Sequence, residues 1–259
     1  MKTDHLILIL AIPVIAGLRY LSSPRILTYT NEPTMLQPTS LPTNHPTTPY
    51  PTISFSSIVR TREDIADLLQ NENGMEVGAE IGVQQGHFAA HNLNKWTKCK
   101  RYYLVDVWKK QQNYDDLANV DNEQQENLLK KTLSRLSAWT SKLEVRRMFS
   151  SEASLTIKDG ELDFIYFDAR HDYCGVSEDL NLYWSKVRDG GIFSGHDYTY
   201  GGNHHDQDWT LCANGSHVKG SVKRAVDEFA SSYHYDTYIM PGDSHSWMIR
   251  KVSTLIKHN

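Results

Sequence analysis

The residues best suited to chemistry begin with an acid and two glycines, in the stretch Glu80-Ile81-Gly82-Val83-Gln84-Gln85-Gly86. An apolar run precedes this stretch, and a helix is predicted from about His87. Gly82 lets the backbone approach a ligand closely, and Gly86 lets the start of the helix pack tightly on the strand. The free N–H groups of a helix N-terminus favour a bound carboxylate or phosphate. Because three residues separate the glycines, the stretch departs from the GxGxxG spacing of dinucleotide-binding loops.

A second acid, Asp106, follows Gly82 by about 24 residues and ends another apolar segment. An acid at that place can accept hydrogen bonds from both ribose hydroxyls of an adenosyl cofactor. Proteins that bind nicotinamide dinucleotides use an acid in the same way. Asp106 therefore predicts an adenosine-containing ligand, with a solvated loop aspartate as the alternative.

The segments that must position these residues alternate between strand and helix patterns. Strands are predicted over Val77–Ile81, Tyr102–Val105, Leu143–Met148, Leu162–Phe167, Ile192–Ser194, Tyr235–Met240 and Ser246–Val252. Helices are predicted from about Thr61, from about His87, and over Asp121–Leu136, Val176–Val187 and Ser221–Ala230. The alternation predicts an α/β fold with a doubly wound, mostly parallel, seven-stranded sheet, whose last strand is antiparallel because a tight turn precedes it. Acids end four of these strands (Glu80, Asp106, Asp168 and Asp197), where such sheets bind ligands.

A further motif runs from Leu162 to Tyr173 (LDFIYFDARHDY), and Trp184, Gly190-Gly191 and Gly195-His196-Asp197-Tyr198 follow it. With the acid-and-glycine loop, this order resembles the class I S-adenosylmethionine (SAM) methyltransferases. Over about Met75–Lys251 it is most similar to the macrocin and sugar O-methyltransferase-like group, a methyltransferase-24-like domain. The resemblance implies a Rossmann-like fold and methylation of a small-molecule or sugar hydroxyl. The cofactor-binding residues that it implies are Glu80, Gly82, Gln85, Gly86, Asp106, Val107, Ser150, Ser151 and Asp168.

In metal-dependent relatives, acids after the fourth and fifth strands hold a divalent cation, which implies Asp168, His196 and Asp197 as ligands here. Oxygen ligands suit Mg²⁺, whereas the imidazole shifts the preference toward Mn²⁺. The alternative is that both aspartates only hydrogen-bond nearby loops. Methyl transfer needs alignment of the acceptor and removal of its proton, by a bound cation or by an imidazole. The candidate catalytic residues are His171, His196 and Asp168.

The N-terminal part has a different composition. Residues 1–21 contain an apolar run that suits a signal peptide or a short signal anchor, and residues 22–52 form a Pro/Thr-rich stalk. The methyltransferase domain is predicted over residues 53–259. This organisation predicts the secretory pathway: a single-pass type II membrane protein, such as a Golgi enzyme, or a secreted protein if the N-terminus is cleaved. The glycosylation sequon Asn214-Gly215-Ser216 agrees with a lumenal domain.

Composition excludes little, but it is informative about partners. The net charge of −4 gives no electrostatic reason to expect nucleic acid, so the expected partner is a small-molecule or sugar acceptor. The three cysteines, Cys99, Cys174 and Cys212, show neither CxxC nor zinc spacing, and they allow at most one disulfide. The oligomeric state has no signal in the sequence.

Three other functions fit parts of the sequence. A type II glycosyltransferase would use Asp206-Gln207-Asp208 as its metal-binding Asp-x-Asp motif. A non-catalytic protein could keep the SAM site, and a nicotinamide-dependent oxidoreductase is weakened by the glycine spacing and the terminal hairpin. The loop that holds His204-His205, with Tyr198, Tyr200 and Trp209, could cover an acceptor, or its aromatic residues could simply pack.

Overall fold

The computed structural model describes residues 59–201, 203–204, 207–242 and 245–252. The predicted signal segment, residues 1–21, and the stalk, residues 22–52, lie outside the described residues, as do His205 and Asp206. Within the described part of the chain, no helix combines the length and the apolar character needed to cross a membrane. The N-terminal predictions therefore stay predictions.

One large sheet organises the described residues. Its strands are β1 (Val77–Ile81), β2 (Arg101–Asp106), β3 (Leu143–Arg147), β4 (Leu162–Phe167), β5 (Val187–Gly195), β8 (Tyr238–Ile239) and β9 (Trp247–Arg250). The α-helices are α1 (Ile65–Asn71), α2 (His87–Lys95), α3 (Asn122–Arg135), α4 (Ser150–Ser154), α5 (Tyr173–Trp184) and α6 (Ser221–Ser232). Two 3₁₀ helices, η1 (Arg62–Asp64) and η2 (Ser137–Lys142), and a small pair, β6 (Asn203–His204) and β7 (Gln207–Asp208), complete the fold.

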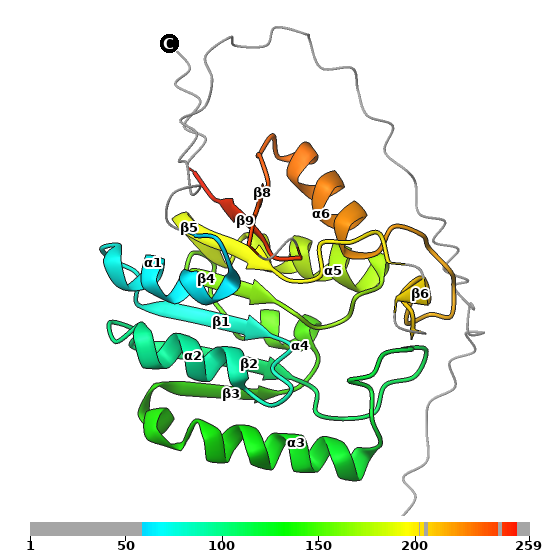
Figure 1. The fold of residues 1–259 in the computed structure, drawn as a ribbon, viewed down its shortest axis with the longest axis horizontal. Helices are drawn as coiled ribbons and strands as arrows, with labels where there is room; N and C mark the ends of the chain where they lie inside the picture. Colours follow the sequence, from blue (N-terminus) through cyan, green and yellow to red (C-terminus); the bar gives the residue numbers. More distant parts are fainter. Residues whose placement is uncertain (1–58, 202, 205–206, 243–244, 253–259) are drawn as a thin grey trace, which may run out of the picture. The chain divides into compact units, whose positions relative to one another are not determined.

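The strand order is β3-β2-β1-β4-β5-β9-β8. Strands β1 to β5 are parallel, so their carboxyl ends reach one edge of the sheet, as the arrowheads in Figure 1 show. Strand β9 is antiparallel to both β5 and β8. The seven-stranded, mostly parallel sheet and the antiparallel last strand are thus confirmed. The order reverses between β1 and β4, which is the place where open sheets of this kind bind ligands.

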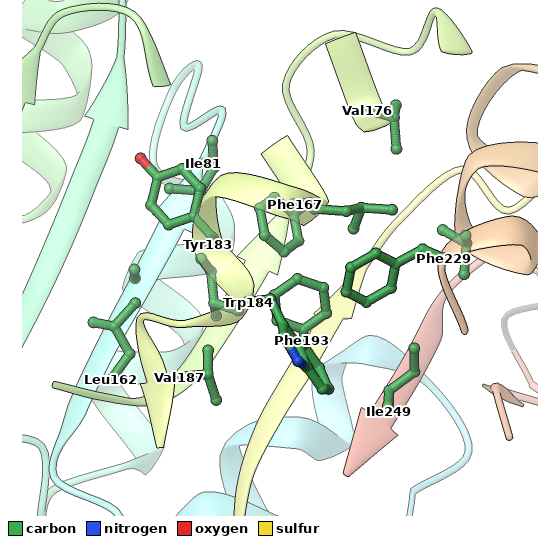
Figure 2. Packing of buried hydrophobic residues seen from close by; sticks show 14 of the residues in the cluster. Ile81, Leu162, Phe167, Val176, Tyr183, Trp184, Val187, Phe193, Phe229 and Ile249 are labelled. Atoms are coloured by element: carbon green, nitrogen blue, oxygen red, sulfur yellow. The ribbon is translucent and has the colours of Figure 1, made fainter. Parts of the chain in front are cut away.

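Apolar side chains on both faces of the sheet produce two cores. Along β2, Tyr103 and Val105 face one core, whereas Tyr102 and Leu104 face the other, because successive side chains of a strand point to opposite faces. Figure 2 shows the first core, where Phe193 from β5 lies close to Trp184 of α5 and Phe229 of α6. Burial on both faces explains why these strands read as almost continuously apolar.

Strand β5 begins earlier than the sequence indicates. The predicted helix ends at Val187 and the predicted strand begins at Ile192, yet Val187, Gly190 and Gly191 all lie within β5. The Gly190 N–H donates to the Lys251 carbonyl at 2.6 Å, and the Lys251 N–H donates to the Gly191 carbonyl at 3.0 Å. A side chain at Gly191 would lie 2.6 Å from Val187, so this glycine serves close packing inside the strand. The last two strands are also shorter than predicted.

Candidate active site

The turn between β1 and α2 brings the glycine loop against the end of β4. Gly82 has φ +88°, and a Cβ added there would lie 2.0 Å from the Asp168 carbonyl oxygen. Gly86 also has a positive φ, and a Cβ there would approach Thr132 of α3 to 2.9 Å. Gly86 therefore serves close packing, but against α3 rather than against the strand as predicted. Gly82 allows two main-chain segments to touch, which places Asp168 beside the loop.

Asp106 closes the same loop from β2. Its carboxylate accepts hydrogen bonds from the main-chain N–H groups of Val83 and Gln84, both at 2.9 Å, and from that of Trp108 at 2.8 Å. The Asp106 side chain is only partly buried and lines the neighbouring cleft. It can therefore hold the loop and still present oxygen to a ligand.

An open cleft of about 1000 Å³ lies beyond the carboxyl ends of β1, β2 and β4. Six of the predicted cofactor residues line it: Gly82, Asp106, Val107, Ser150, Ser151 and Asp168. The other three, Glu80, Gln85 and Gly86, are not part of the lining, whereas Gln84 is. The Gln85 carbonyl instead accepts a hydrogen bond from Arg135.

Glu80 lies beneath the cleft rather than in its wall. Its side chain is buried, and the Tyr102 hydroxyl donates to it at 3.4 Å. Burial, together with the nearby charge of Asp168, raises the pKa of Glu80 well above its usual value. Glu80 can therefore support the glycine loop as a neutral acid, without direct contact to a ligand.

The cleft also contains a residue that sequence reasoning missed, Asp179 of α5. This carboxyl group is buried, and its Oδ1 atom has no hydrogen-bond partner among the described residues. Burial raises the pKa of Asp179 to about 7, although a hydrogen bond with Ser150 opposes the shift. Asp179 lies on the buried face of α5, among apolar residues. The one signal in the sequence that could have identified it is an acidic residue at a helix position where an apolar residue is expected.

We expect the substitution Asp179→Asn to stabilise the protein at pH 8 but not at pH 4. The folded-state pKa lies above the usual aspartate value of 3.8, so Asp179 destabilises the fold progressively as pH rises from about 4 to about 7. The expected difference in the free energy of unfolding at pH 8 is on the order of 3 kcal/mol. Urea denaturation between pH 4 and pH 8 measures the free energy of unfolding of both proteins. Asp236→Asn, at an exposed aspartate, is the control. A difference that does not vary with pH would contradict this.

The acids at the ends of β4 and β5 converge on His171. Its Nε2 atom lies 3.1 Å from an Asp197 oxygen and 3.5 Å from an Asp168 oxygen. Its Nδ1 atom lies 2.8 Å from Asp116, a residue of the loop between β2 and α3. Burial alone would lower the pKa of His171, but the hydrogen bond with Asp116 and the nearby carboxylates of Asp168 and Asp197 raise it to about 10.

This cluster has the donor set of a divalent cation site. One ligand atom from each of Asp168, His171 and Asp197 lies within 4.8 Å of the others. A carboxylate only accepts hydrogen bonds, so Asp116 keeps a proton on Nδ1 and directs Nε2 toward the two aspartates. Nε2 is buried and has no well-oriented hydrogen-bond partner among the described residues. A cation bound between the aspartates would satisfy it.

His196, the histidine predicted as a ligand, lies on the other side of Asp197. Its Nδ1 atom is 3.3 Å from the second Asp197 oxygen, and its ring centroid is 6.4 Å from that of His245. Burial opposes protonation, yet Asp197 and Asp168 raise the pKa of His196. The structure thus brings the three predicted catalytic residues together, and it groups His171 rather than His196 with the two aspartates.

The loop between β7 and α6, together with the loop between β2 and α3, covers the cluster. The Trp209 ring centroid lies 4.4 Å from that of His171, and the Trp209 indole N–H donates to Asp116 at 3.0 Å. Cys212 of the same loop forms a disulfide with Cys174 at the start of α5, while Cys99 stays free and buried. Trp209 therefore contributes to the site by packing on His171 and by its hydrogen bond to Asp116.

The comparisons with known proteins agree with this geometry. Residues 79–198 match a family model described as a methyltransferase domain. A Corynebacterium glutamicum protein of solved structure has a TM-score of 0.52 at 12% identity, over 76% of this chain and 82% of its own. This likeness shows the fold. No curated protein matched the chain.

Two other solved structures are less similar. An SAH-bound methyltransferase from Podospora anserina (SAH is S-adenosylhomocysteine) has a TM-score of 0.49 at 14% identity, over 74% of this chain and 78% of its own. An O-methyltransferase from Bacillus cereus in complex with SAH has a TM-score of 0.48 at 13% identity, over 73% of this chain and 78% of its own. The matched segment of our chain contains the glycine loop, the acidic cluster and all residues of the cleft lining except Ala213. Residues 79–198 therefore match a methyltransferase domain, in a chain that shares its fold with the Corynebacterium glutamicum protein.

Proposed function

We propose that the protein transfers the methyl group of SAM to a hydroxyl of a small molecule or sugar. The observation that carries this proposal is the position of Asp168, which lines the cofactor cleft and also belongs to the cluster with His171 and Asp197. A hydroxyl held at this cluster would lie beside the cleft that we assign to SAM. Proximity and alignment are the main requirements of this reaction, since the sulfonium already activates the methyl carbon.

The cofactor assignment follows from the cleft lining. The glycine loop would hold the amino-acid end of SAM, Asp106 its ribose, and Ser150 and Ser151 would flank the adenine. Asp168, His171 and Asp197 would hold Mg²⁺ or Mn²⁺, and a cation bound there would lower the pKa of an acceptor hydroxyl. If His171 is a ligand, His196 is the remaining imidazole of the site that can accept the hydroxyl proton.

Two measurements on the full-length chain test this function. Calorimetry should show SAH binding, and a panel of hydroxyl compounds incubated with tritiated SAM should yield a labelled ether. Binding of SAH without transfer to any compound of the panel would favour the non-catalytic alternative. Absence of SAH binding to folded protein would contradict the cofactor assignment. The Asp-x-Asp motif of the glycosyltransferase alternative stays a prediction, since Asp206 lies outside the described residues.

We further propose a lumenal or extracellular location for the domain. A disulfide between Cys174 and Cys212 is most stable in an oxidising compartment, and the predicted signal segment agrees with it. Asn214, in the only sequon of the sequence, is exposed on the loop after Cys212.

In secretory expression we expect an N-glycan on Asn214, because its amide is exposed in a turn at the protein surface. Peptide N-glycosidase treatment should increase the electrophoretic mobility of the wild type. It should leave Asn214→Gln and Ser216→Ala unchanged. Identical mobility of treated and untreated wild type would argue against lumenal exposure of this loop.

A further inference from the structure

An open groove beside the start of α6 lies outside the cofactor cleft. It is lined by Tyr200, Gly201, Thr210, Lys219, Gly220 and Arg224, none of which lines that cleft. Its empty volume is about 750 Å³. We infer that this groove, the α6 groove, binds an acidic saccharide unit of the acceptor, next to the unit that is methylated. The inference rests on the proposed function, because it extends the same acceptor site.

The α6 groove lies directly behind the residues that cover the catalytic cluster. A Cβ added at Gly201 would lie 3.3 Å from the Trp209 Cβ and 2.5 Å from that of Ser221. Trp209 packs on His171, and the Ser221 hydroxyl donates to the His171 carbonyl at 2.5 Å. Trp209 and Ser221 are themselves buried, so they form the wall that the catalytic cluster and the α6 groove share.

Two glycines line the groove. Gly201 has φ +62° and Gly220 has φ +112°, so both adopt the left-handed region that other residues rarely enter. A Cβ at Gly220 would lie 2.4 Å from Cδ of Arg224. A side chain at either position would collide with its neighbours, so the backbone path along this side of the groove requires glycine.

The charges of the α6 groove favour an anion. Lys223 pairs with Asp227 at 2.7 Å, and Arg224 pairs with Glu228 at 2.8 Å. Lys219 is exposed and forms no ion pair within the described part of the chain. Of the two basic residues that line the groove, Arg224 already has an acidic partner, whereas Lys219 has none among the described residues. The Lys219 ammonium group can therefore bind a carboxylate or sulfate directly.

The aromatic side of the groove favours a sugar ring. Tyr200 lines the groove and is 62% exposed, so its ring is accessible to a ligand. The Lys223 ammonium lies 5.1 Å from its ring centroid, so the ring is held beside a positive charge. A sugar with an acidic substituent can pack its apolar face on Tyr200 while its anionic group reaches Lys219.

The test is calorimetry on the full-length chain saturated with SAH. The probes are hyaluronan octasaccharide, which carries carboxylates, heparin octasaccharide, which adds sulfates, and neutral maltooctaose. We expect at least one acidic octasaccharide to bind more tightly than maltooctaose. Lys219→Gln and Tyr200→Ala should each weaken that binding by about fivefold. Lys130→Gln, an exposed lysine on α3, is the matched control and should bind like the wild type.

The outcomes separate this inference from the proposed function. Binding of hyaluronan indicates that a carboxylate suffices, and binding of heparin alone indicates sulfate. If neither acidic octasaccharide binds, if maltooctaose binds equally well, or if Lys219→Gln binds like the wild type, the α6 groove assignment is overturned. SAH titration of the same preparations tests the cofactor site independently. Intact SAH binding with unchanged saccharide binding in Lys219→Gln would therefore overturn only the groove.

Discussion

Replacing Gly82 with alanine is expected to weaken SAH binding by at least about 100-fold, or 2.7 kcal/mol. The added Cβ would lie 2.0 Å from the Asp168 carbonyl oxygen and 2.4 Å from the Asp168 carbonyl carbon. Neither atom belongs to a flexible side chain, so the glycine loop or the end of β4 must move. Either movement displaces residues that line the cofactor cleft. Calorimetry with SAH measures the loss.

Gly160 provides the matched control for Gly82. It also has a positive φ, +69°, but no atom lies within 4 Å of an added Cβ. Gly160→Ala therefore reports the backbone strain alone, which is about 1–2 kcal/mol in the free energy of unfolding, and it should bind SAH like the wild type. Thermal unfolding of both variants separates strain from the collision at Asp168. Wild-type affinity in folded Gly82→Ala would show that the loop is not part of the cofactor site.

The positions of the strand-end acids could be predicted because they depend on local patterns. Buried parallel strands read as apolar runs, and the residue that ends each run must lie at the ligand-binding edge. Asp106 and Asp168 are placed as predicted, and both line the cleft. The sequence could also indicate the antiparallel last strand, since a tight turn joins the final two segments.

The surroundings of His171 could not be predicted, because they depend on two loops that are distant in sequence. The Leu117 N–H donates to the Gln207 side chain at 2.7 Å, and the Asp208 N–H donates to Asp115 at 2.9 Å. These contacts between the two loops hold Asp116 and Trp209 beside His171. No periodic pattern encodes them. Spacing likewise cannot tell toward which aspartate oxygen a neighbouring histidine turns, so the sequence offered both His171 and His196 as bases and pointed to His196 as the ligand.

Asp168→Asn is expected to lower the rate of methyl transfer by about 1000-fold, roughly 4 kcal/mol in the activation barrier. It should change SAH affinity by less than about threefold, because only one of many cleft contacts is altered. The physical reason is the cluster: an amide there supplies less negative charge for a cation beside the acceptor oxygen. Transfer of label from tritiated SAM to an acceptor found in the panel measures the rate. An equal loss of SAH affinity would instead assign Asp168 to cofactor binding.

Mn²⁺ binding, followed by electron paramagnetic resonance, discriminates between the two histidines. If the geometry is correct, Asp168→Asn and His171→Ala lose the bound Mn²⁺ signal, whereas His196→Ala keeps it. The proton on His171 competes with the cation, since its pKa is about 10 without metal and the ligand must be neutral. Mn²⁺ affinity should therefore rise by about tenfold per pH unit between pH 6 and 8. Loss of the signal in His196→Ala alone would restore the ligand set predicted from the sequence, with His171 left as a neighbour of the site.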